Sequence, residues 1–496
     1  MSYFLGIDLG TSSVKALLIR MDGQAQGFAQ EHYSIDVPQA GWAEQSPEMW
    51  WKAAVRAIRK ALAVSKLNPG DIRGIGFSGQ MHGLVALDRN GKAVRPGIIW
   101  ADQRSIEQVE EINAMLREQQ FLHQTMNAVS TGFALPSLLW MKEHEPAHFA
   151  SIDKILLPKD YLRYRLTGEV ATEATDASST LAFNTLERAW AYDLLNKLNV
   201  PVEFFPDCYN PMDLAGYVTE KAALETGLKV NTPVVYGGSD QCMQAVGNGI
   251  VAPGIVSLNI GTGGQVSTML EQPLYDEECR MNTFNHIFPN TWNIQGSSLN
   301  SGLSVKWLKD NVLHLRDFDE MTELASRAAP GSEGVIFLPY LSGERTPHMD
   351  PLAKSCFFGL TLKHRQEHMV RSVFEGVVYS LRDALELLEA KGIRCEKVIA
   401  SGGGAKSPVW LQIQADILGK EIFTTTTEEE ACVGAAIMAA VGTGAYPSVH
   451  SACRHMIAMR EVSYRPNLEL ASVYHRSYSI FKQLYQRNYD LFQAWL

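Results

Sequence analysis

The opening segment of the chain, DLGTSSVK (8–15), brings together a carboxylate, a glycine, three hydroxyls and a lysine. Gly10 permits a tight turn in which consecutive backbone N–H groups can face an anion, and Lys15 adds positive charge. Asp8 ends an apolar run and is suited to hold Mg²⁺ through water. The hydroxyl donors of the turn are Thr11, Ser12 and Ser13. The segment predicts a phosphate-binding turn, and an ordinary polar hairpin is the alternative.

The same pattern returns in the second half of the chain. IVSLNIGTGGQVSTML (255–270) can be laid over FLGIDLGTSSVKALLI (4–19) without gaps, so that Gly261 and Thr262 fall on the earlier Gly-Thr pair. Two such turns, one from each of two related domains, could clamp a polyphosphate from opposite sides. A dinucleotide-binding fingerprint that starts at Gly261 would need glycine at the position of Val266.

A third glycine-rich segment, SGGGAKS (401–407), lies between an expected strand and an expected helix. Its backbone could approach a flat nucleoside closely, and the start of a helix is electropositive. It is not a Walker A loop, because Ala405 rather than glycine precedes Lys406. An ordinary glycine loop is the alternative.

Two strand ends carry side chains that could act on a hydroxylated substrate. Asp240, in GGSDQC (237–242), follows a strand, and its carboxylate could accept a proton from a substrate hydroxyl during phosphoryl transfer. Aspartate at this place could also cap the following helix, and the two roles are compatible. In SGQMHG (78–83), His82 could hydrogen-bond a polyol or keto oxygen, with a structural loop histidine as the alternative.

One segment, HEPAH (144–148), fits the H-E-x-x-H pattern of zinc sites. Both histidines must then lie on one continuous helix, but Pro146 lacks a backbone N–H and clashes with the preceding turn. We therefore expect one helix to end near Glu145 and another to begin at Pro146, without a zinc site.

The elements that must position these groups alternate between strands and helices, which is typical of α/β proteins. The expected strands include 3–8, 14–19, 72–79 and 396–401, and the expected helices include 47–64, 428–442 and 471–495. Because the Gly-Thr turn occurs once at the start of each half, we predict two related domains, 1–248 and 249–496. The C-terminal helix 471–495 has aromatic residues at helical spacing and could pack back on the first domain.

The composition of the 496 residues excludes several classes of function. Lys plus Arg number 44 against 54 for Asp plus Glu, a net charge of −10 that argues against nonspecific binding of nucleic acid or anionic membranes. No apolar run approaches the ~18–20 residues of a membrane span. The nearest two of the seven cysteines, Cys432 and Cys453, are 21 residues apart, which indicates reduced thiols in the cytoplasm.

Taken together, these segments resemble the FGGY carbohydrate kinases, sugar kinases of the actin-like ATPase superfamily, over essentially the whole chain. DLGTSSVK is similar to the family's first phosphate loop, and SGGGAKS is similar to its adenosine loop. SCFFGLTLKHRQEHMVRSVFE (355–375) and YLSGERTPHMDP (340–351) are also typical of the family. The resemblance implies two actin-like (ribonuclease H-like) α/β domains that flank a deep catalytic cleft, with ATP and Mg²⁺ as cofactors and a sugar as substrate.

Within the family, three segments are similar to the branch that phosphorylates D-xylulose to D-xylulose 5-phosphate: QMHG (80–83), WADQR (100–104) and PKDYLRYRLTG (158–168). That branch usually has asparagine after the catalytic aspartate, whereas Gln241 stands there in this chain. Kinases of gluconate, ribulose or L-xylulose in the same family are therefore alternatives.

The resemblance also implies roles for individual residues. Asp240 is then the catalytic base, and the sugar site comprises Met81, His82, Asp240, Gln241 and Asp102. The implied nucleotide contacts are Thr11, Ser12, Ser13, Lys15, Gly261, Thr262, Gly302, Gly403, Gly404 and Ala405, with Asp8 for the metal.

Two other classes of protein could use parts of this pattern. An actin-like ATPase, such as a chaperone or filament protein, would share the nucleotide fold, and a sugar sensor would bind without catalysis. Met81, His82 and Asp240 at strand ends favour a small-substrate pocket, and the two phosphate turns argue against a sensor. We expect a small-molecule sugar and ATP as partners, together with a second copy of the chain in a homodimer, and no nucleic acid or membrane.

Overall fold

Each copy of the repeated segment forms an antiparallel hairpin, and each hairpin begins a sheet. In the computed structural model, which describes residues 2–118 and 121–494, β1 (Tyr3–Leu9) pairs with β2 (Ser13–Arg20), and β16 (Ile255–Ile260) pairs with β17 (Gly264–Leu270). The first strand of each hairpin also pairs in parallel with a later strand, β1 with β5 and β16 with β22. The turns after β1 and β16 and the loops after β5 and β22 therefore lie at corresponding edges of the two sheets.

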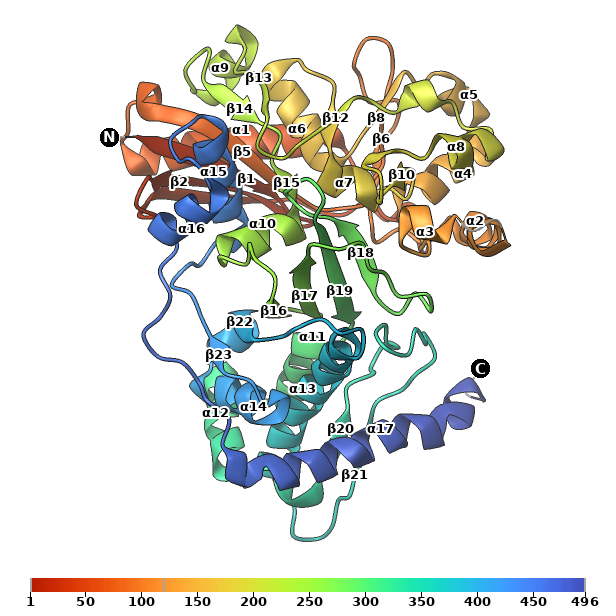
Figure 1. Ribbon diagram of the computed structural model, residues 1–496, viewed down its shortest axis with the longest axis vertical. Helices are drawn as coiled ribbons and strands as arrows, with labels where there is room; N and C mark the ends of the chain where they lie inside the picture. Colours follow the sequence, from red (N-terminus) through yellow and green to blue (C-terminus); the bar gives the residue numbers. More distant parts are fainter. Residues whose placement is uncertain (1, 119–120, 495–496) are drawn as a thin grey trace.

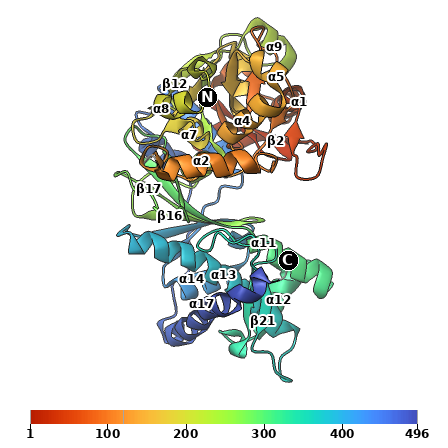
Figure 2. The same cartoon turned by 90° about the vertical axis from the view of Figure 1, so that its right-hand side faces the viewer.

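The first-domain sheet has the order β13-β14-β5-β1-β2-β3, with β15 on β5, and the second-domain sheet has the order β18-β19-β17-β16-β22-β23. The remaining strands of the first-domain sheet are β3 (Ala25–His32), β5 (Ile72–Gly79), β13 (Leu214–Tyr217), β14 (Pro233–Val235) and β15 (Gly238–Ser239). Those of the second-domain sheet are β18 (Asn282–Asn285), β19 (Trp292–Ser298), β22 (Lys397–Gly402) and β23 (Ile422–Phe423). The two sheets belong to two lobes stacked along the long axis of the molecule (Figures 1 and 2). This is the two-domain α/β fold that the sequence predicts.

The two hairpins differ by one residue in their turns. Asp8 faces Lys15 across the first hairpin, whereas Asn259 faces Gln265 across the second. The gapless overlay of 255–270 on 4–19 is therefore correct up to the turn and one residue out of register after it. The second turn is tighter because it consists of Gly261, Thr262 and Gly263 between the paired ends, and glycine accepts such turns readily.

Helices cover both sheets, and their apolar faces form the cores. α1 (Pro47–Ser65) starts at the expected proline and buries Trp50 and Ala54 against the first-domain sheet. α13 (Gln366–Ala390) is the long helix of the second-domain core. The other helices of the first lobe include α2 (Ile106–Glu118), α4 (Ala134–His144), α5 (Pro146–Ala150), α6 (Pro158–Thr167), α7 (Ala174–Ser179), α8 (Tyr192–Lys197), α9 (Glu220–Thr226) and α10 (Asp240–Gly247), and those of the second include α11 (Ser301–Trp307), α12 (Phe318–Arg327) and α14 (Pro408–Leu418).

The break predicted in the HEPAH segment is confirmed. α4 ends at His144 and α5 begins at Pro146, so the two histidines do not share one helix. Among the described residues, no group of three or more His, Cys, Asp or Glu side chains could hold a metal ion alone.

Two helices of the second half lie on the first-domain sheet rather than on their own. α15 (Glu430–Gly442) packs across β1 and β5, and α16 (Val449–Met456) follows it there (Figure 1). A Cβ atom at Gly6 would overlap the Cys432 carbonyl, and one at Gly76 would overlap the Ala435 carbonyl, so helix and sheet are in backbone contact. Residues 430–456 therefore lie with the first domain in space, although the predicted division at 248/249 assigns them to the second.

The C-terminal helix, α17 (Ala471–Gln493), lies on the second domain, which corrects the expectation that it packs back on the first. Its aromatic face, including Tyr474, Tyr478 and Phe481, is buried in the second-domain core. Buried hydrogen bonds hold it there: among them, Arg371 donates to the Tyr474 hydroxyl at 2.9 Å, and Tyr478 donates to Asp383. In Figure 1 the helix crosses the far end of the second lobe. Trp495, the last residue of the expected span, lies outside the described residues. No helix of the described part of the chain is both long and apolar enough to span a bilayer.

Candidate active site

The turns and strand ends singled out in the sequence meet around a cavity of about 490 Å³ between the two sheets. From the first domain it is lined by Asp8, Gly10, Lys15, Trp100, Asp240, Gln241 and Gln244. Facing them from the second domain are Asn259, Gly261, Thr262, Gly263, Gly264, Gln265, Ser297, Ser298 and Arg345. Glu429 to Ala431, at the start of α15 on the first-domain sheet, complete the lining. The fold therefore brings both Gly-Thr turns and the candidate base to one place.

A second cavity of about 400 Å³ adjoins the first, and the two share Glu429 and Glu430. It is lined by the glycine-rich loop, including Gly403, Ala405 and Lys406. Gly404 is buried, and a side chain there would press into Ile260, so it serves the close packing of the loop on β16. A ligand that fills both cavities would place a flat group at the loop and a polyphosphate between the turns, as the sequence predicts.

Asp240 is the first residue of α10, directly after the N-cap position held by Ser239. The fold anchors this corner through the Ser239 N–H, which donates to Thr175 Oγ1 at 2.9 Å. Burial and the negative charge of Asp8 raise the pKa of Asp240 to about 7. The carboxyl accepts a hydrogen bond from the Gln241 N–H at 2.7 Å, which opposes the rise. A pKa near neutrality suits a group that must accept a proton.

We expect this pKa to govern the pH dependence of catalysis. A base acts only when deprotonated, so for the sugar kinase activity that the resemblance implies, kcat/KM for the sugar, with the nucleotide saturating, is expected to rise with pH and level off above about pH 7. Titration of His82 does not contribute to the profile above pH 6, because burial lowers its pKa to about 4. The profile is measured from pH 5 to 9 by coupled release of ADP, and a flat profile from pH 6 to 9 would contradict the role of Asp240.

Asp8 fits the place of a metal-binding carboxylate. It is the second-to-last residue of β1, accepts a hydrogen bond from Ser78 Oγ at 2.7 Å, and has its pKa raised by burial. The acidic groups around the cavity, with Asp8 and Asp240 foremost, provide only oxygen ligands, which Mg²⁺ prefers. Because Mg²⁺ is usually held by one or two carboxylates plus the phosphates of a nucleotide, these residues fit the ion.

Several polar groups of the first phosphate turn are already bonded to other parts of the protein, which the sequence does not indicate. Lys15 forms an ion pair with Glu429 at 2.6 Å. Although burial opposes it, this contact raises the pKa of Lys15. The Gly10 N–H donates to the Ser13 carbonyl at 2.9 Å, and Thr11 Oγ1 accepts from the Trp100 indole at 2.9 Å. Ser13 Oγ accepts from Gln30, and Ser12 is exposed. Of this segment, Asp8, Gly10 and Lys15 line the cavity.

Gly302 supports the second turn from behind. The Gly302 N–H donates to the Gly261 carbonyl at 3.0 Å, and the Leu303 N–H donates to the Thr262 carbonyl at 2.9 Å. A Cβ at Gly302 would overlap the Gly261 carbonyl oxygen. Gly302 was expected to contact nucleotide; in the structure it lets the start of α11 dock on the turn, outside the cavity lining.

His82 is held rigidly beside the cleft. Its ring stacks on Phe133 with centroids 3.9 Å apart, and Nδ1 lies 2.8 Å from the Ser179 carbonyl. A carbonyl oxygen only accepts, so Nδ1 carries the proton, and Nε2 is left as an acceptor for a hydroxyl group. Met81 is buried in the neighbouring core. Neither Met81 nor His82 lines the cavity between the two sheets, although the charge of Arg345, which does line it, acts on His82.

Asp102 and Gln241, both expected to bind sugar, differ in their surroundings. Asp102 is 1% exposed, and its oxygens accept hydrogen bonds from the Ala43 N–H at 2.7 Å and from Arg104 at 2.7–3.0 Å. It lies outside the cavity lining, and its oxygens are already bonded to Arg104 and to the Ala43 N–H. Gln241 lines the cavity, and among the described residues its buried Oε1 has no hydrogen-bond partner. Gln241 can therefore accept from a ligand hydroxyl.

Several cavity residues were not predicted from the sequence. They are Trp100, Gln244, Asn259, Gln265, Ser297, Ser298, Arg345, Glu429 and Glu430. Two of them, Trp100 and Arg345, stand in segments that resemble the family, so a signal was present. The spacing along the chain gave no sign of which of their side chains would face the cleft.

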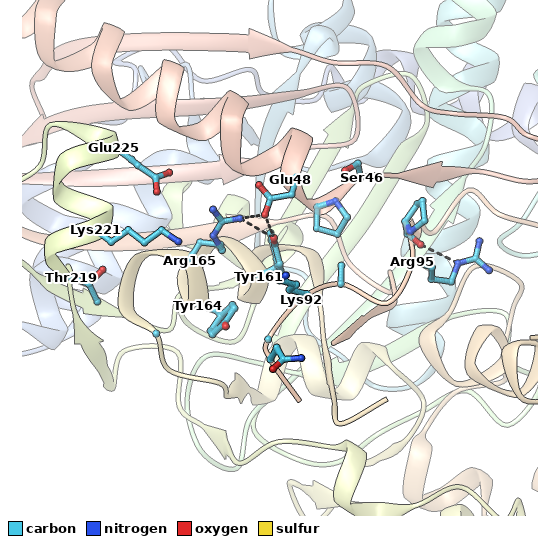
Figure 3. A pocket seen from close by; sticks show the side chains of 16 residues that line it. Ser46, Glu48, Lys92, Arg95, Tyr161, Tyr164, Arg165, Thr219, Lys221 and Glu225 are labelled. Carbon is cyan, nitrogen blue, oxygen red and sulfur yellow. Dashed lines mark hydrogen bonds and ion pairs between the residues drawn. The ribbon is translucent and has the colours of Figure 1, made fainter. Parts of the chain in front are cut away.

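A larger cavity, of about 930 Å³, lies on the outer side of the first domain (Figure 3). None of the predicted site residues line it. Its Arg165 is engaged by Glu48, which also accepts from the Tyr161 hydroxyl at 2.8 Å. Size alone is therefore a poor guide to the active site in this molecule.

Known proteins resemble the chain over nearly its whole length. Models of the N-terminal and C-terminal domains of the FGGY family of carbohydrate kinases match residues 3–247 and 256–443. A xylulose kinase of Lactococcus lactis is 36% identical over 99% of this chain and 98% of its own. A crystal structure of a "xyloylose kinase" from Brucella ovis superposes with a TM-score of 0.92 at 32% identity, covering 99% of this chain and 100% of the other. A gluconokinase of Bacillus subtilis is 30% identical over 89% of this chain and 88% of its own.

Proposed function

The chain belongs to the FGGY family of carbohydrate kinases, and from that membership we propose that it transfers the γ-phosphoryl group of ATP to the terminal hydroxyl of a pentulose, D-xylulose, to give D-xylulose 5-phosphate. The observation that carries the proposal is the position of Asp240. Its carboxyl has a pKa of about 7 and lines one cavity with both Gly-Thr turns. Relatives such as the Lactococcus lactis xylulose kinase support the choice of sugar.

In the proposed mechanism, Asp240 accepts the proton of the sugar hydroxyl as its oxygen attacks the γ-phosphorus in line. The oxygen–phosphorus bond forms while the bond from the γ-phosphorus to the bridging oxygen of ADP breaks. His82 Nε2 and Gln241 Oε1 accept from other sugar hydroxyls and orient the ring-opened ketose. The backbone of the Gly261–Gly264 turn lies where it can contact the phosphates. Bound Mg²⁺, held by Asp8, would neutralise negative charge on the phosphates.

A substrate panel tests the proposal. D-xylulose, L-xylulose, D-ribulose, glycerol and gluconate are compared by kcat/KM in a coupled ADP assay, and D-xylulose is expected to give the largest value. A larger kcat/KM for another compound would contradict the choice of sugar but leave the kinase activity intact. ATP hydrolysis that is stimulated by polypeptides and indifferent to sugars would instead favour an actin-like chaperone.

Gluconate is the second candidate. It is favoured by the 30% identity to a gluconokinase and by Gln241 beside the base. A glutamine side chain is one methylene longer than asparagine and so reaches further into the cavity. Gln241→Asn is therefore worth including in the panel, since a shift of preference between gluconate and D-xylulose would identify this position as selective.

Two further features are part of the proposal. We expect a homodimer, which light scattering after size exclusion would test, and a cytoplasmic location in keeping with the scattered free cysteines.

A further inference from the structure

Arg345 is a cavity residue whose charge has no acidic partner. Its guanidinium lines the same cavity as Asp240 and the Gly261–Gly264 turn. Among the ion pairs of the described residues, none includes Arg345. The side chain is exposed to the cleft, and burial nevertheless lowers its pKa, so the charge is partly dehydrated. An unpaired, partly dehydrated cation in a cleft favours an anionic ligand.

The negative charge of the neighbouring Glu344 raises the pKa of Arg345 and so partly offsets the effect of burial, but the two side chains form no ion pair. Glu344 Oε2 accepts from Ser298 Oγ at 2.8 Å, and Oε1 accepts from the backbone N–H groups of Leu299 and Arg345 at 2.9 and 2.7 Å. The Glu344 side chain thus braces the loop, and the Arg345 side chain points the other way, into the cleft.

The loop that carries Arg345 is fastened to the strand beside the second phosphate turn. The Thr346 N–H donates to the Ser297 carbonyl at 3.0 Å, and the Ser297 N–H donates to Thr346 Oγ1 at 3.0 Å. Ser298, the next residue of β19, pairs with Gly264 at the end of that turn. The backbone of Arg345 is therefore held at a fixed distance from the Gly261–Gly264 turn, and its long side chain lines the cavity.

The charges around the cavity give Arg345 a particular importance. Four carboxylates line it: Asp8, Asp240, Glu429 and Glu430. The other lining cation, Lys15, is engaged by Glu429 at 2.6 Å. Arg345 comes from the second domain, yet its charge acts on His82 of the first, so it lines the cavity on the side near His82. A polyanion entering so acidic a cavity requires cations, and Arg345 is one that no carboxylate holds.

We propose that Arg345 is a catalytic residue that donates hydrogen bonds to the phosphoryl group while it passes from the nucleotide to the sugar. The proposal rests on the phosphoryl transfer stated under Proposed function. Arg345 stays protonated throughout, since the proton of the attacking hydroxyl goes to Asp240. Its planar fork of N–H donors matches two equatorial oxygens of the transferred group. Because those donors are aimed where charge develops, the contact would act on kcat rather than on sugar affinity.

Arg345→Ala and Arg345→Lys test this role, assayed with the best substrate of the panel. We expect kcat to fall roughly 10²–10³-fold in Arg345→Ala, with the KM of the sugar changed less than about threefold. Arg345→Lys should recover only part of the loss, because a lysine cannot bind two oxygens in a fork. Guanidinium chloride at a low, non-denaturing concentration should partly restore Arg345→Ala but not Asp240→Asn, with sodium chloride as the ionic control.

Arg316→Ala is the matched control, because Arg316 is exposed, pairs with Asp317 and lies outside the cavity lining. It should keep wild-type kinetics and thermal stability. A rise in the KM of the sugar with an unchanged kcat would make Arg345 a sugar-binding residue and overturn the proposal, as would an unchanged kcat without such a rise. The wild type reports separately on the proposed function: if it phosphorylates no sugar, both proposals fail, whereas normal wild-type transfer with an unaffected variant contradicts only the role of Arg345.

Discussion

Asp240→Asn is expected to lower kcat for sugar phosphorylation roughly 10³-fold while leaving the affinity for the sugar nearly unchanged. Asparagine keeps the size of the side chain and an oxygen that can accept from the Gln241 N–H, which aspartate accepts from at 2.7 Å. It has no basic group near pH 7, so the hydroxyl proton loses its acceptor. Turnover is measured by ADP release and sugar affinity by calorimetry.

The control for this variant is Asp193→Asn, which changes an exposed aspartate in the first turn of another helix, α8. It should leave turnover and stability within experimental error. Near-normal turnover in Asp240→Asn would show that another group accepts the proton. A loss of sugar binding together with turnover would instead indicate that the Asp240 corner positions the sugar.

Lys159→Met is expected to reduce the free energy of unfolding by roughly 3–5 kcal/mol. The Lys159 amino group is fully buried and contacts three buried carboxylates: Asp160 at 2.8 Å, Asp176 at 3.0 Å and Glu173 at 3.2 Å. Methionine has a similar volume, so the loss comes mainly from leaving Asp176 and Glu173 without their cation, whereas Asp160 keeps Arg163 at 3.8 Å. Urea denaturation followed by circular dichroism measures the change, and Lys60→Met, at an exposed ion pair with Glu31, should cost less than about 1 kcal/mol.

The loss in Lys159→Met should depend on pH in a definite direction. Burial holds the pKa of Asp176 above its unfolded value, and loss of the cation removes an interaction that opposes this rise, so protonation of Asp176 stabilises the folded variant. The difference from wild type should therefore be smaller near pH 5 than near pH 8. Burial already raises the pKa of Asp176 in the intact cluster, which makes it the first group to take up a proton. A difference that does not change with pH would show that packing, and not charge, dominates.

The Lys159 cluster also has a consequence for the sugar site. α7, which carries Asp176, presents the Ser179 carbonyl to His82 at 2.8 Å and the Thr175 hydroxyl to the Ser239 N–H at 2.9 Å. The cluster therefore fixes the helix α7, which in turn anchors His82 and the segment that carries Asp240. Any Lys159→Met protein that stays folded should have a higher KM for the sugar.

The features that could be predicted from the sequence are those set by local chemistry. The Gly-Thr turns follow from glycine between two apolar runs, and the break at Pro146 follows from its missing N–H. Asp240 could be placed at the end of a strand and the start of a helix because both signals lie within a few residues of it. The family resemblance added the assignment of roles, which no local pattern contains.

What only the tertiary structure decided are the partners of those residues. Lys15 meets Glu429 across 414 positions of the chain, α15 returns to the first-domain sheet, and α17 stays on the second. Asp102 and Arg345 are both charged residues in the sequence, yet Asp102 is buried against Arg104 and Arg345 lines the cavity. The physical reason is that spacing along a chain determines which face of an element a side chain occupies, whereas its partner depends on how distant elements pack, and a charged group is stabilised by whichever counter-charge that packing brings to it.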